Sequence, residues 1–504
     1  MDPNNYNIFS FIKRNARIYG NRIALILGNE RITHGQFLEN VNQLSCGLMD
    51  AGVEKGDRIA ILSQNSLAYA YLCGAAAKIG AILLPLNWRL DSEEIEYIIS
   101  DGTPKIIFVS SEFQDMMKPL IPKFCFIKKT YALGQADGFF EAFNDLMISE
   151  GISPEGNIRS DDDYMIIYTA AVEGRPRGAL LSHQNVIASN LQSIYYWALT
   201  KEDVHLLLLP FFHIAGLGMV LSVMQVGGSN IIIPKFDVDL ALKHIQEDKV
   251  TVFGEFPPIL KTLMEKAEGG NYDLSSVRHV VGLDHPDTIK KFQEMSGGTF
   301  WSVYGQSETS GVFTFAPYFE KPGSAGLPSF MAEVEIVDEY DNFVETGQSG
   351  EIVIRGPMVF KGYWNQEKDN AYIFRNGWHH TGDMGSFDAD GYLWYKGRST
   401  TKDLIKTGGE NVYPAEVETA ILKHPAVKEA VVFGVPDSKW GETIKAVCVL
   451  KQGERLTEIE LIEFVAGRIA RYKKPNHVVF TSSLPKNENG FVDRQKVKAD
   501  YGKA

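Results

Sequence analysis

Residues 168–178, YTAAVEGRPRG, combine a loop of small residues with two arginines at the end of an apolar run. The preceding DDYMIIYT is typical of a strand and the following ALLSH is apolar again, so the segment predicts a loop between two buried elements. A strand, a small-residue loop and a basic residue are the outline of a phosphate cradle. Glu173 argues against that use, because its carboxylate would repel a triphosphate at close range. An ordinary Gly/Pro turn is the alternative interpretation.

Two histidines also stand where they could take part in chemistry. His213 lies in the apolar run LPFFHIAGLG, where a lone histidine is more often a packed core residue than a ligand. His285 follows Asp284 in VVGLDHPD, and such a pair could act as acid and base. The alternative for this second segment is a surface turn at the start of a helix, capped by Asp287.

Alternating strand-like and helix-like segments must position these loops. RIAILSQ, AILLPL and KIIFVSS have the texture of strands, and LAYAYLCGAAAKIG between the first two has that of a helix. The same alternation returns from HLLLLP to HVVGLD and continues through about residue 300. This rhythm predicts two α/β units built on parallel sheets covered by helices.

The last third of the chain predicts two further units. From Val334 the segments EVEIVDEY, GEIVIRG and GYLWYKG alternate with Gly and Asp turns, which indicates a β-rich subdomain. After Arg398 the polar STTKD, a glycine pair and Pro414 are typical of a junction, and strands and a helix sufficient for a small α+β domain follow. Because 504 residues are too many for one compact core, we expect a large domain over residues 1–398 and a small one over 399–504.

The composition disfavours several classes of function. A formal net charge of −13, without a long basic run, disfavours nucleic acid as a partner. The four cysteines stand far apart without a CxxC pair or a matching histidine spacing, so neither a Cys/His metal site nor a disulfide framework is expected. No apolar stretch reaches about 18 residues and the N-terminus lacks a targeting pattern, so we expect no membrane span and a cytoplasmic location.

Four later motifs carry a resemblance to a known family. They are YGQSETSG (304–311), TGD (381–383), YKGRSTTKDLIKTGGENVYPAEVE (395–418) and LPKNENG (484–490). In this order, and with YTAAVEGRPRG before them, they resemble the AMP-forming acyl-CoA synthetases over nearly the whole chain. The resemblance implies an α/β fold in which two α/β subdomains and a β-rich subdomain form the large N-terminal domain, with a small α+β C-terminal domain on a hinge.

The resemblance also assigns roles to residues of the large domain. It places Glu308 at Mg²⁺, which requires oxygen ligands, and His213 at the acyl pocket. It implies that the nucleotide is bound by a larger set, from the phosphate loop, the adenine strand and the ribose-contacting strands: Thr169, Gly174, Arg177, Tyr304, Ser307, Asp383 and Arg398.

In the small domain the same resemblance implies a hinge and a CoA-facing loop. Lys402 or Asp403 would be the hinge on which the domain rotates. Gly408, Gly409 and Glu410 would then present backbone to the pantetheine arm of CoA, since glycine permits close approach. The ligands implied are CoA, AMP or ATP with Mg²⁺, and a small acyl substrate or its CoA thioester.

Two departures from the family pattern affect the same half-reaction. Where the family has Ser-Gly-Thr-Thr in the phosphate loop, this chain has Ala170, Ala171, Val172 and Glu173. At the position of the family's adenylation lysine it has Phe491, and a phenyl ring cannot supply a mobile cation. We therefore predict that ATP-dependent adenylation is weak or lost, with Lys486 as a candidate substitute for the lysine.

Three functions remain open at this point. The first is an acid–CoA ligase in which Arg177, Glu308 and a compensating lysine carry weakened adenylation. The second is a non-adenylating enzyme that performs hydrolytic or acid–base chemistry on an acyl-CoA, with Glu173, His285 or His213 as acid or base. The third is a protein that binds acyl-CoA or a nucleotide without turnover. The sequence indicates neither the acid nor the oligomeric state, so a homo-oligomer is left open.

Overall fold

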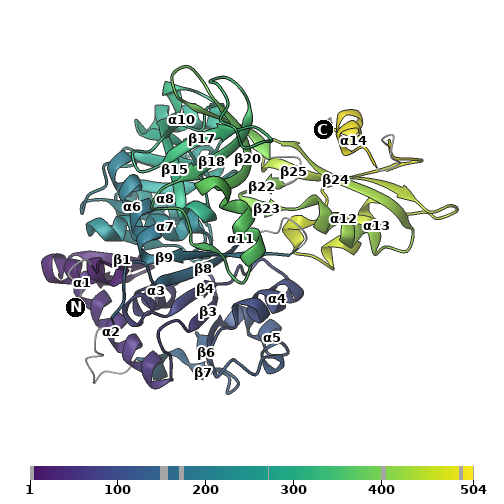
Figure 1. Cartoon of the computed structure of the whole chain (residues 1–504). Helices are drawn as coiled ribbons and strands as arrows, with labels where there is room; N and C mark the ends of the chain where they lie inside the picture. Colours follow the sequence, from purple (N-terminus) through teal and green to yellow (C-terminus); the bar gives the residue numbers. More distant parts are fainter. Residues whose placement is uncertain are drawn as a thin grey trace.

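The computed structural model describes residues 5–147, 157–169, 175–270, 272–398, 404–486 and 492–502. They form a large N-terminal domain and, from residue 404 onward, a smaller one beside it (Figure 1). The mixed α/β class predicted from the sequence is confirmed. The predicted boundary at residue 398 stays a prediction, because residues 399–403 lie outside the described ranges.

The first sheet of the large domain is parallel at its centre, and antiparallel strands complete one edge. Its order is β19-β9-β8-β4-β3-β5-β6-β7. The strands are β3 (Arg58–Leu62), β4 (Ile82–Pro85), β5 (Ile106–Ser110), β6 (Lys129–Leu133), β7 (Glu141–Ala142), β8 (Asp163–Thr169), β9 (Arg177–Ser182) and β19 (Gly362–Tyr363).

The second sheet has the order β16-β15-β14-β13-β12-β10-β11-β1-β2, again with a parallel centre. The strands are β1 (Ile23–Leu27), β2 (Glu30–Thr33), β10 (Val204–Leu207), β11 (Ser229–Ile232), β12 (Val252–Glu255), β13 (His279–Gly282), β14 (Thr299–Gln306), β15 (Gly311–Pro317) and β16 (Leu327–Pro328). The two sheets are the two α/β units that the alternating pattern predicted.

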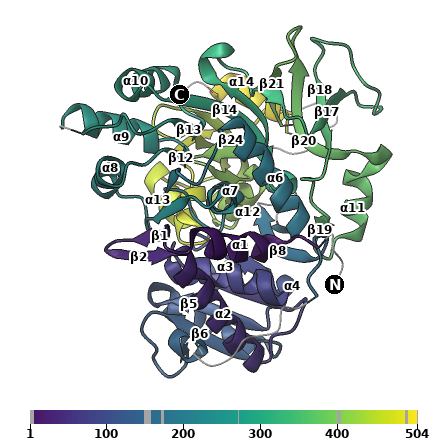
Figure 2. The ribbon, with the colours of Figure 1, turned by 90° about the vertical axis from the view of Figure 1, so that its left-hand side faces the viewer.

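Helices cover both faces of both sheets, so the large domain is layered (Figure 2). Between the sheets lie α1 (Ile8–Tyr19), α2 (His34–Asp50), α3 (Leu67–Ile79) and α7 (Ile214–Val226), whose apolar side chains form one shared core. Outside lie α4 (Ser92–Gly102) and α5 (Gln114–Met117) on the first sheet, and α8 (Val238–Glu247), α9 (Ile259–Glu268) and α10 (Pro286–Ser296) on the second. The shared core fixes the two carboxyl edges relative to each other.

Local sequence explains where the central helix α3 begins and ends. The Ser66 side chain accepts a hydrogen bond from the Tyr69 amide and so caps the first turn. Gly80 ends the helix with φ +74°, a left-handed conformation that favours glycine. Nearly every residue between them is buried, because α3 packs in the layer between the two sheets. No helix within the described ranges is both long and apolar enough to cross a bilayer.

The β-rich subdomain and the small domain complete the chain. The former is an antiparallel sheet of β17 (Glu333–Val337), β18 (Gly350–Arg355), β20 (His379–Phe387) and β21 (Leu393–Arg398), with α6 (His183–Tyr196) and α11 (Glu367–Ile373) nearby. The small domain contains the hairpin β22 (Ile405–Thr407) and β23 (Glu410–Val412), a sheet of β24 (Val427–Asp437), β25 (Gly441–Leu450) and β26 (His477–Thr481), and helices α12 (Pro414–Leu422), α13 (Glu458–Ala466) and α14 (Arg494–Tyr501).

A buried lysine joins the small domain to helix α4 of the large domain. Lys473 is 3% exposed, and its ammonium group contacts Glu94 of the large domain and lies 2.7 Å from Glu416 of the small one. Burial raises the pKa of Glu94 to about 7, since Lys473 can neutralise only one of the two carboxylates it meets. The contact between the domains therefore includes a carboxyl group that titrates near neutrality.

We predict that docking of the two domains strengthens as the pH falls from about 7 to about 4.5. The docked Glu94 has a pKa of about 7 against an ordinary 4.5, so docking takes up a proton between those values and weakens as the pH rises through them. Energy transfer between a dye on each domain measures this. Glu94→Gln should remove the pH dependence that Glu94 contributes, whereas the exposed neighbour Glu93→Gln should retain all of it. A wild-type signal that is independent of pH would contradict the prediction.

Candidate active site

The carboxyl end of β14 carries the first group of candidate residues. After Gln306 the chain turns through a short 3₁₀ helix, Ser307–Thr309, which the Thr309 hydroxyl stabilises by donating to the Gln306 and Gly311 carbonyls. Because this edge belongs to the parallel part of the sheet, it is where ligands bind in doubly wound folds. The turn leaves Tyr304 and Glu308 buried on the two sides of the edge.

Asp383 is the centre of a buried polar cluster. It is fully buried and accepts hydrogen bonds from the Tyr304 hydroxyl and the Gln306 amide, each at 2.6 Å. Arg398 lies opposite it on β21, with Nε 3.0 Å from Oδ1. Burial and the Asp383 charge raise the pKa of Tyr304 well above 10, which keeps the phenol protonated as the donor. The three residues predicted to contact ribose and adenine, Tyr304, Asp383 and Arg398, thus come together with Gln306, which the sequence did not single out.

Glu308 belongs to a second cluster, at the junction of the two α/β units. Its carboxylate accepts a hydrogen bond of 2.6 Å from the Tyr363 hydroxyl, and the Arg177 guanidinium stacks 4.1 Å above the Tyr363 ring. Arg177 also forms an ion pair with Asp369 at 3.0 Å. Burial lowers the pKa of Arg177, but Tyr363, Asp369 and Glu308 together raise it above its usual value. The predicted pair Arg177 and Glu308 is therefore close, with Tyr363 between them.

This second cluster fits the Mg²⁺ that the family resemblance implies. Tyr363 occupies only one of the two Glu308 carboxylate oxygens, and Mg²⁺ is commonly held by one or two carboxylates together with substrate phosphates. The described residues include no group of three or more Asp, Glu, His or Cys side chains that could hold a metal by itself. Glu308 would therefore act as a ligand only when a phosphate supplies the remaining oxygens.

The hairpin β22–β23 brings the predicted CoA-facing loop against the large domain. Gly408 and Gly409 have φ +56° and +85°, both in the region that favours glycine. A Cβ at Gly408 would lie 2.8 Å from the Trp440 ring, and one at Gly409 would lie 3.0 Å from the Phe256 ring. Both the backbone conformation and the space therefore require glycine at these two positions.

Glu410 anchors this hairpin. Only 7% exposed, it accepts hydrogen bonds from Arg89 Nη1 at 2.5 Å, His213 Nε2 at 3.2 Å and Asn87 Nδ2 at 3.4 Å. Burial would raise the pKa of Glu410, but His213 and Arg89 lower it to about 2. The carboxylate is therefore ionised and holds the two domains together. Sequence reasoning named Glu410 and His213 separately and missed Arg89, because nothing in the surrounding PLNWRL marks it as a partner.

The side chains of the other predicted residues that the structure describes lie outside the hydrogen-bonded clusters around Asp383, Glu308 and Glu410. Thr169 ends β8 and its hydroxyl donates to the Arg177 carbonyl at 3.4 Å, while Ser307 is half-buried in the 3₁₀ turn. His285 is the N-cap residue that precedes α10, with its side chain 73% exposed, and its described ionic contact is with Asp287 at 3.8 Å. The structure does not join His285 to either cluster by a described contact. The predictions for Glu173, Gly174, Lys402, Asp403 and Phe491 lie outside the described residues.

A buried carboxyl pair was missed by the sequence reasoning. Glu255 ends β12, is fully buried, and neither of its carboxyl oxygens has a side-chain hydrogen-bond partner among the described residues. Burial, and then the neighbouring Asp284, raise its pKa well above 4.5. Burial likewise raises the pKa of Asp284, whose Oδ1 accepts a hydrogen bond from the His285 amide. Of the predicted Asp284–His285 pair, the aspartate is thus the half-buried member.

Comparison with known proteins matches two family models to this chain. Residues 12–364 match the model of the AMP-binding enzyme family, and residues 416–490 match that of the AMP-binding enzyme C-terminal domain. A feruloyl-CoA synthase from Amycolatopsis sp is 33% identical, with 99% of this chain and 100% of the relative covered. An indoleacetate–CoA ligase from Aromatoleum aromaticum is 31% identical, with 97% of each chain covered.

Solved structures give the same result. The chain superimposes on a putative long-chain-fatty-acid CoA ligase from Rhodopseudomonas palustris with TM-score 0.75 and 44% identity, over 78% of this chain and 99% of the other. An o-succinylbenzoate CoA synthetase from Bacillus subtilis gives TM-score 0.84 at 29% identity over 97% of each chain. With the family model matching most of its length, this chain belongs to the AMP-binding enzyme family, among the AMP-forming acid–CoA ligases.

Proposed function

We propose that this enzyme forms or processes the CoA thioester of a carboxylic acid, with the CoA-dependent half-reaction retained and ATP-dependent adenylation weakened. The observation that carries the proposal is the Glu410 contact, which seats the Gly408–Gly409 turn against Phe256 at the end of β12. A turn held there by ionised groups of the large domain supports a CoA-facing state. The names of the relatives, feruloyl-CoA synthase and indoleacetate–CoA ligase among them, support an organic acid as the substrate.

The reaction consists of two displacements. The acid's carboxylate attacks the α-phosphorus of ATP and releases pyrophosphate, and the CoA thiol then attacks the acyl carbon, releases AMP and loses its proton to solvent. Mg²⁺, when bound at Glu308, neutralises phosphate charge in the first step. Asp383 accepts hydrogen bonds from the ribose hydroxyls. These replace the hydrogen bonds that Tyr304 and Gln306 donate to it in this structure.

The departures of this chain from the family pattern slow the first displacement and leave the rate of the second unchanged. The missing phosphate-loop hydroxyls would position the phosphates, and a lysine in place of Phe491 would supply positive charge. Adenylation needs both. The hairpin glycines and Glu410 concern the CoA step. A non-adenylating enzyme on acyl-CoA remains the alternative, and consumption of an acyl-CoA without ATP would favour it. Binding of an acyl-CoA without turnover would favour a non-catalytic protein.

We predict that AMP binds more tightly than ATP with Mg²⁺, and that Asp383→Asn weakens AMP binding about 10- to 100-fold. The loss corresponds to one or two hydrogen bonds to a charged group, roughly 1.5–3 kcal/mol in total. Titration calorimetry with AMP and with ATP·Mg²⁺ measures both quantities. Asp390→Asn, an exposed aspartate seven residues further on, is the matched control and should bind AMP like the wild type. ATP·Mg²⁺ binding as tight as that of AMP would contradict the prediction.

We predict that Gly409→Leu reduces CoA-dependent turnover about ten-fold or more without weakening AMP binding. Gly453→Leu is the matched control. Gly453 has a φ of +84° and Gly409 a φ of +85°, so leucine strains the backbone similarly at both positions, but a Cβ at Gly453 meets no atom within 4 Å. A difference between the two variants therefore reports the contact with Phe256 and not backbone strain. Thioester formation from CoA and preformed acyl-adenylates of ferulate, indoleacetate and a fatty acid gives the readout, so the first half-reaction does not limit the rate. Equal CoA-dependent rates in both variants would overturn the role of the hairpin.

We predict that adenylation is restored only by a combined repair. Phe491→Lys together with Ala170→Ser, Ala171→Gly, Val172→Thr and Glu173→Thr should give acid-dependent release of pyrophosphate from ATP. Phe491→Lys alone should not, because charge and phosphate positioning act together and single repairs are non-additive. The repaired loop alone should improve ATP binding more than rate. Brisk adenylation by the unmodified enzyme would show that another lysine acts, and Lys486→Met would then test the first candidate.

A further inference from the structure

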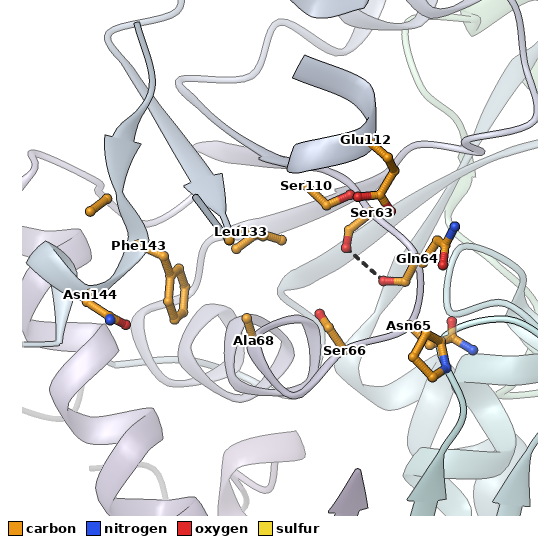
Figure 3. A pocket seen from close by; sticks show the side chains of 13 residues that line it. Ser63, Gln64, Asn65, Ser66, Ala68, Ser110, Glu112, Leu133, Phe143 and Asn144 are labelled. Carbon is orange, nitrogen blue, oxygen red and sulfur yellow. Dashed lines mark hydrogen bonds between the residues drawn. The ribbon is translucent and has the colours of Figure 1, made fainter. Parts of the chain in front are cut away.

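A cavity of about 350 Å³ opens at the carboxyl edge of the first sheet, outside the clusters around Asp383, Glu308 and Glu410. Strand β3 pairs with β4 on one side and with β5 on the other, so the chain direction across the sheet reverses between β3 and β5. In doubly wound folds the crevice at such a reversal is where ligands bind. The cavity lies at this place, between the segments that follow β3, β5 and β6 (Figure 3).

One buried hydroxyl in the cavity wall lacks a partner. Ser110 ends β5, is 6% exposed, and its Oγ has no hydrogen-bond partner among the described residues. The neighbouring Ser63 is already used, since its hydroxyl donates to the Gln64 carbonyl at 2.7 Å. A buried polar group without a partner is unfavourable unless water or a ligand supplies one. Because less than 1 Å² of Ser110 Oγ is exposed, a ligand can supply the missing partner only after this side chain turns toward the cavity.

The remaining walls combine polar groups with an apolar face. The first turn of α3 borders the cavity, and Ala68 there leaves room that a larger side chain would fill. Phe143 and Leu133 form the opposite wall, so the space between them and α3 has one flat apolar side (Figure 3). The volume falls in the range of small-molecule sites, about 300–1,000 Å³.

The charges of the side chains that line the cavity indicate which class of ligand it can bind. Glu112 is the one charged side chain among the described lining residues, and none of those residues is Lys, Arg or His. An anion such as phosphate would meet this carboxylate without a compensating cation, in a chain whose formal net charge is −13. A carboxylate, a free serine hydroxyl and side-chain amides instead suit a neutral molecule rich in hydroxyl groups.

We propose that this cavity binds a neutral polyhydroxylated ring, from a free sugar or from a nucleoside. Glu112 accepts hydrogen bonds from two adjacent hydroxyls of the ring, and the apolar face of the ring lies on Phe143. Ser110 Oγ bonds a third hydroxyl once its side chain has turned toward the cavity. The site is separate from the CoA-ligase chemistry and does not depend on the function proposed above. It is joined to the acyl-pocket loop by Asn65, whose side chain bonds to the Leu209 carbonyl and the Phe211 amide.

Saturation-transfer NMR of the full-length enzyme with D-ribose, myo-inositol and adenosine tests the proposal. Saturable binding of at least one probe is expected. Ala68→Leu should abolish it by filling the cavity, and Glu112→Gln should weaken it about ten-fold through loss of a charged acceptor. The matched controls are Ala499→Leu on the exposed face of α14 and Glu54→Gln at the opposite edge of the same sheet, and both should bind like the wild type. Asn65 is left unchanged because it holds the acyl-pocket loop.

The alternative outcomes are distinct. If ribose and inositol bind, the source is a free sugar; if only adenosine binds and the binding is lost in Ala68→Leu, the source is a nucleoside. The nucleotide site is expected to bind adenosine as well, so adenosine binding that survives in Ala68→Leu reports that site. The proposal is overturned if ribose and inositol fail to bind and Ala68→Leu leaves the adenosine signal unchanged. Failure of every probe to saturate below about 10 mM also overturns it. Binding of inorganic phosphate in this cavity would show that the ligand class is wrong.

Discussion

The buried carboxylate of Glu410 is the constraint on which the arrangement of the two domains depends. An ionised group at 7% exposure is tolerated only with close partners, and here they are Arg89 and His213 of the large domain. Removing Arg89 or His213 would leave the buried Glu410 carboxylate with one partner fewer, where little water can replace it. The hairpin that carries Glu410 must therefore stay at the edge of the large domain for as long as this contact exists, and the position of the CoA-facing glycines follows from it.

The second contact between the domains reinforces the first because both use one short segment. Asn87 and Arg89 meet Glu410, and Glu94, five residues after Arg89, meets Lys473. The segment between them leads into α4, whose first turn Asp91 caps by accepting from two backbone amides. A rigid, capped start of a helix thus supplies both attachment points. A rotation of the small domain has to break both contacts together, so the docked state is one cooperative arrangement.

Much of the fold was predictable from the sequence, and the pairing of distant side chains was not. Alternating strand and helix patterns predicted the two sheets, because these signals lie within a few residues. The family resemblance, carried by the order of the motifs, pointed to the GGE loop and to Asp383. The Arg89–Glu410 pair spans 321 positions, so no local pattern encodes it. Glu255 was missed for a similar reason: its burial depends on the packing of β12 beneath α9 and α10, and its own segment TVFGEF reads as an ordinary strand.

In the function proposed here, the geometry of Asp383 makes ATP depend on donors around its phosphates more than AMP does. In this structure Asp383 already receives hydrogen bonds from Tyr304 and Gln306, so a nucleotide gains only the difference between those bonds and the ones its ribose makes. For ATP the surplus has to come from groups around the β- and γ-phosphates, where this chain has Ala170, Ala171, Val172 and the acidic Glu173. Under the proposed function the CoA step needs the hairpin and not those donors, so weakened adenylation and a retained CoA half-reaction are compatible in one enzyme.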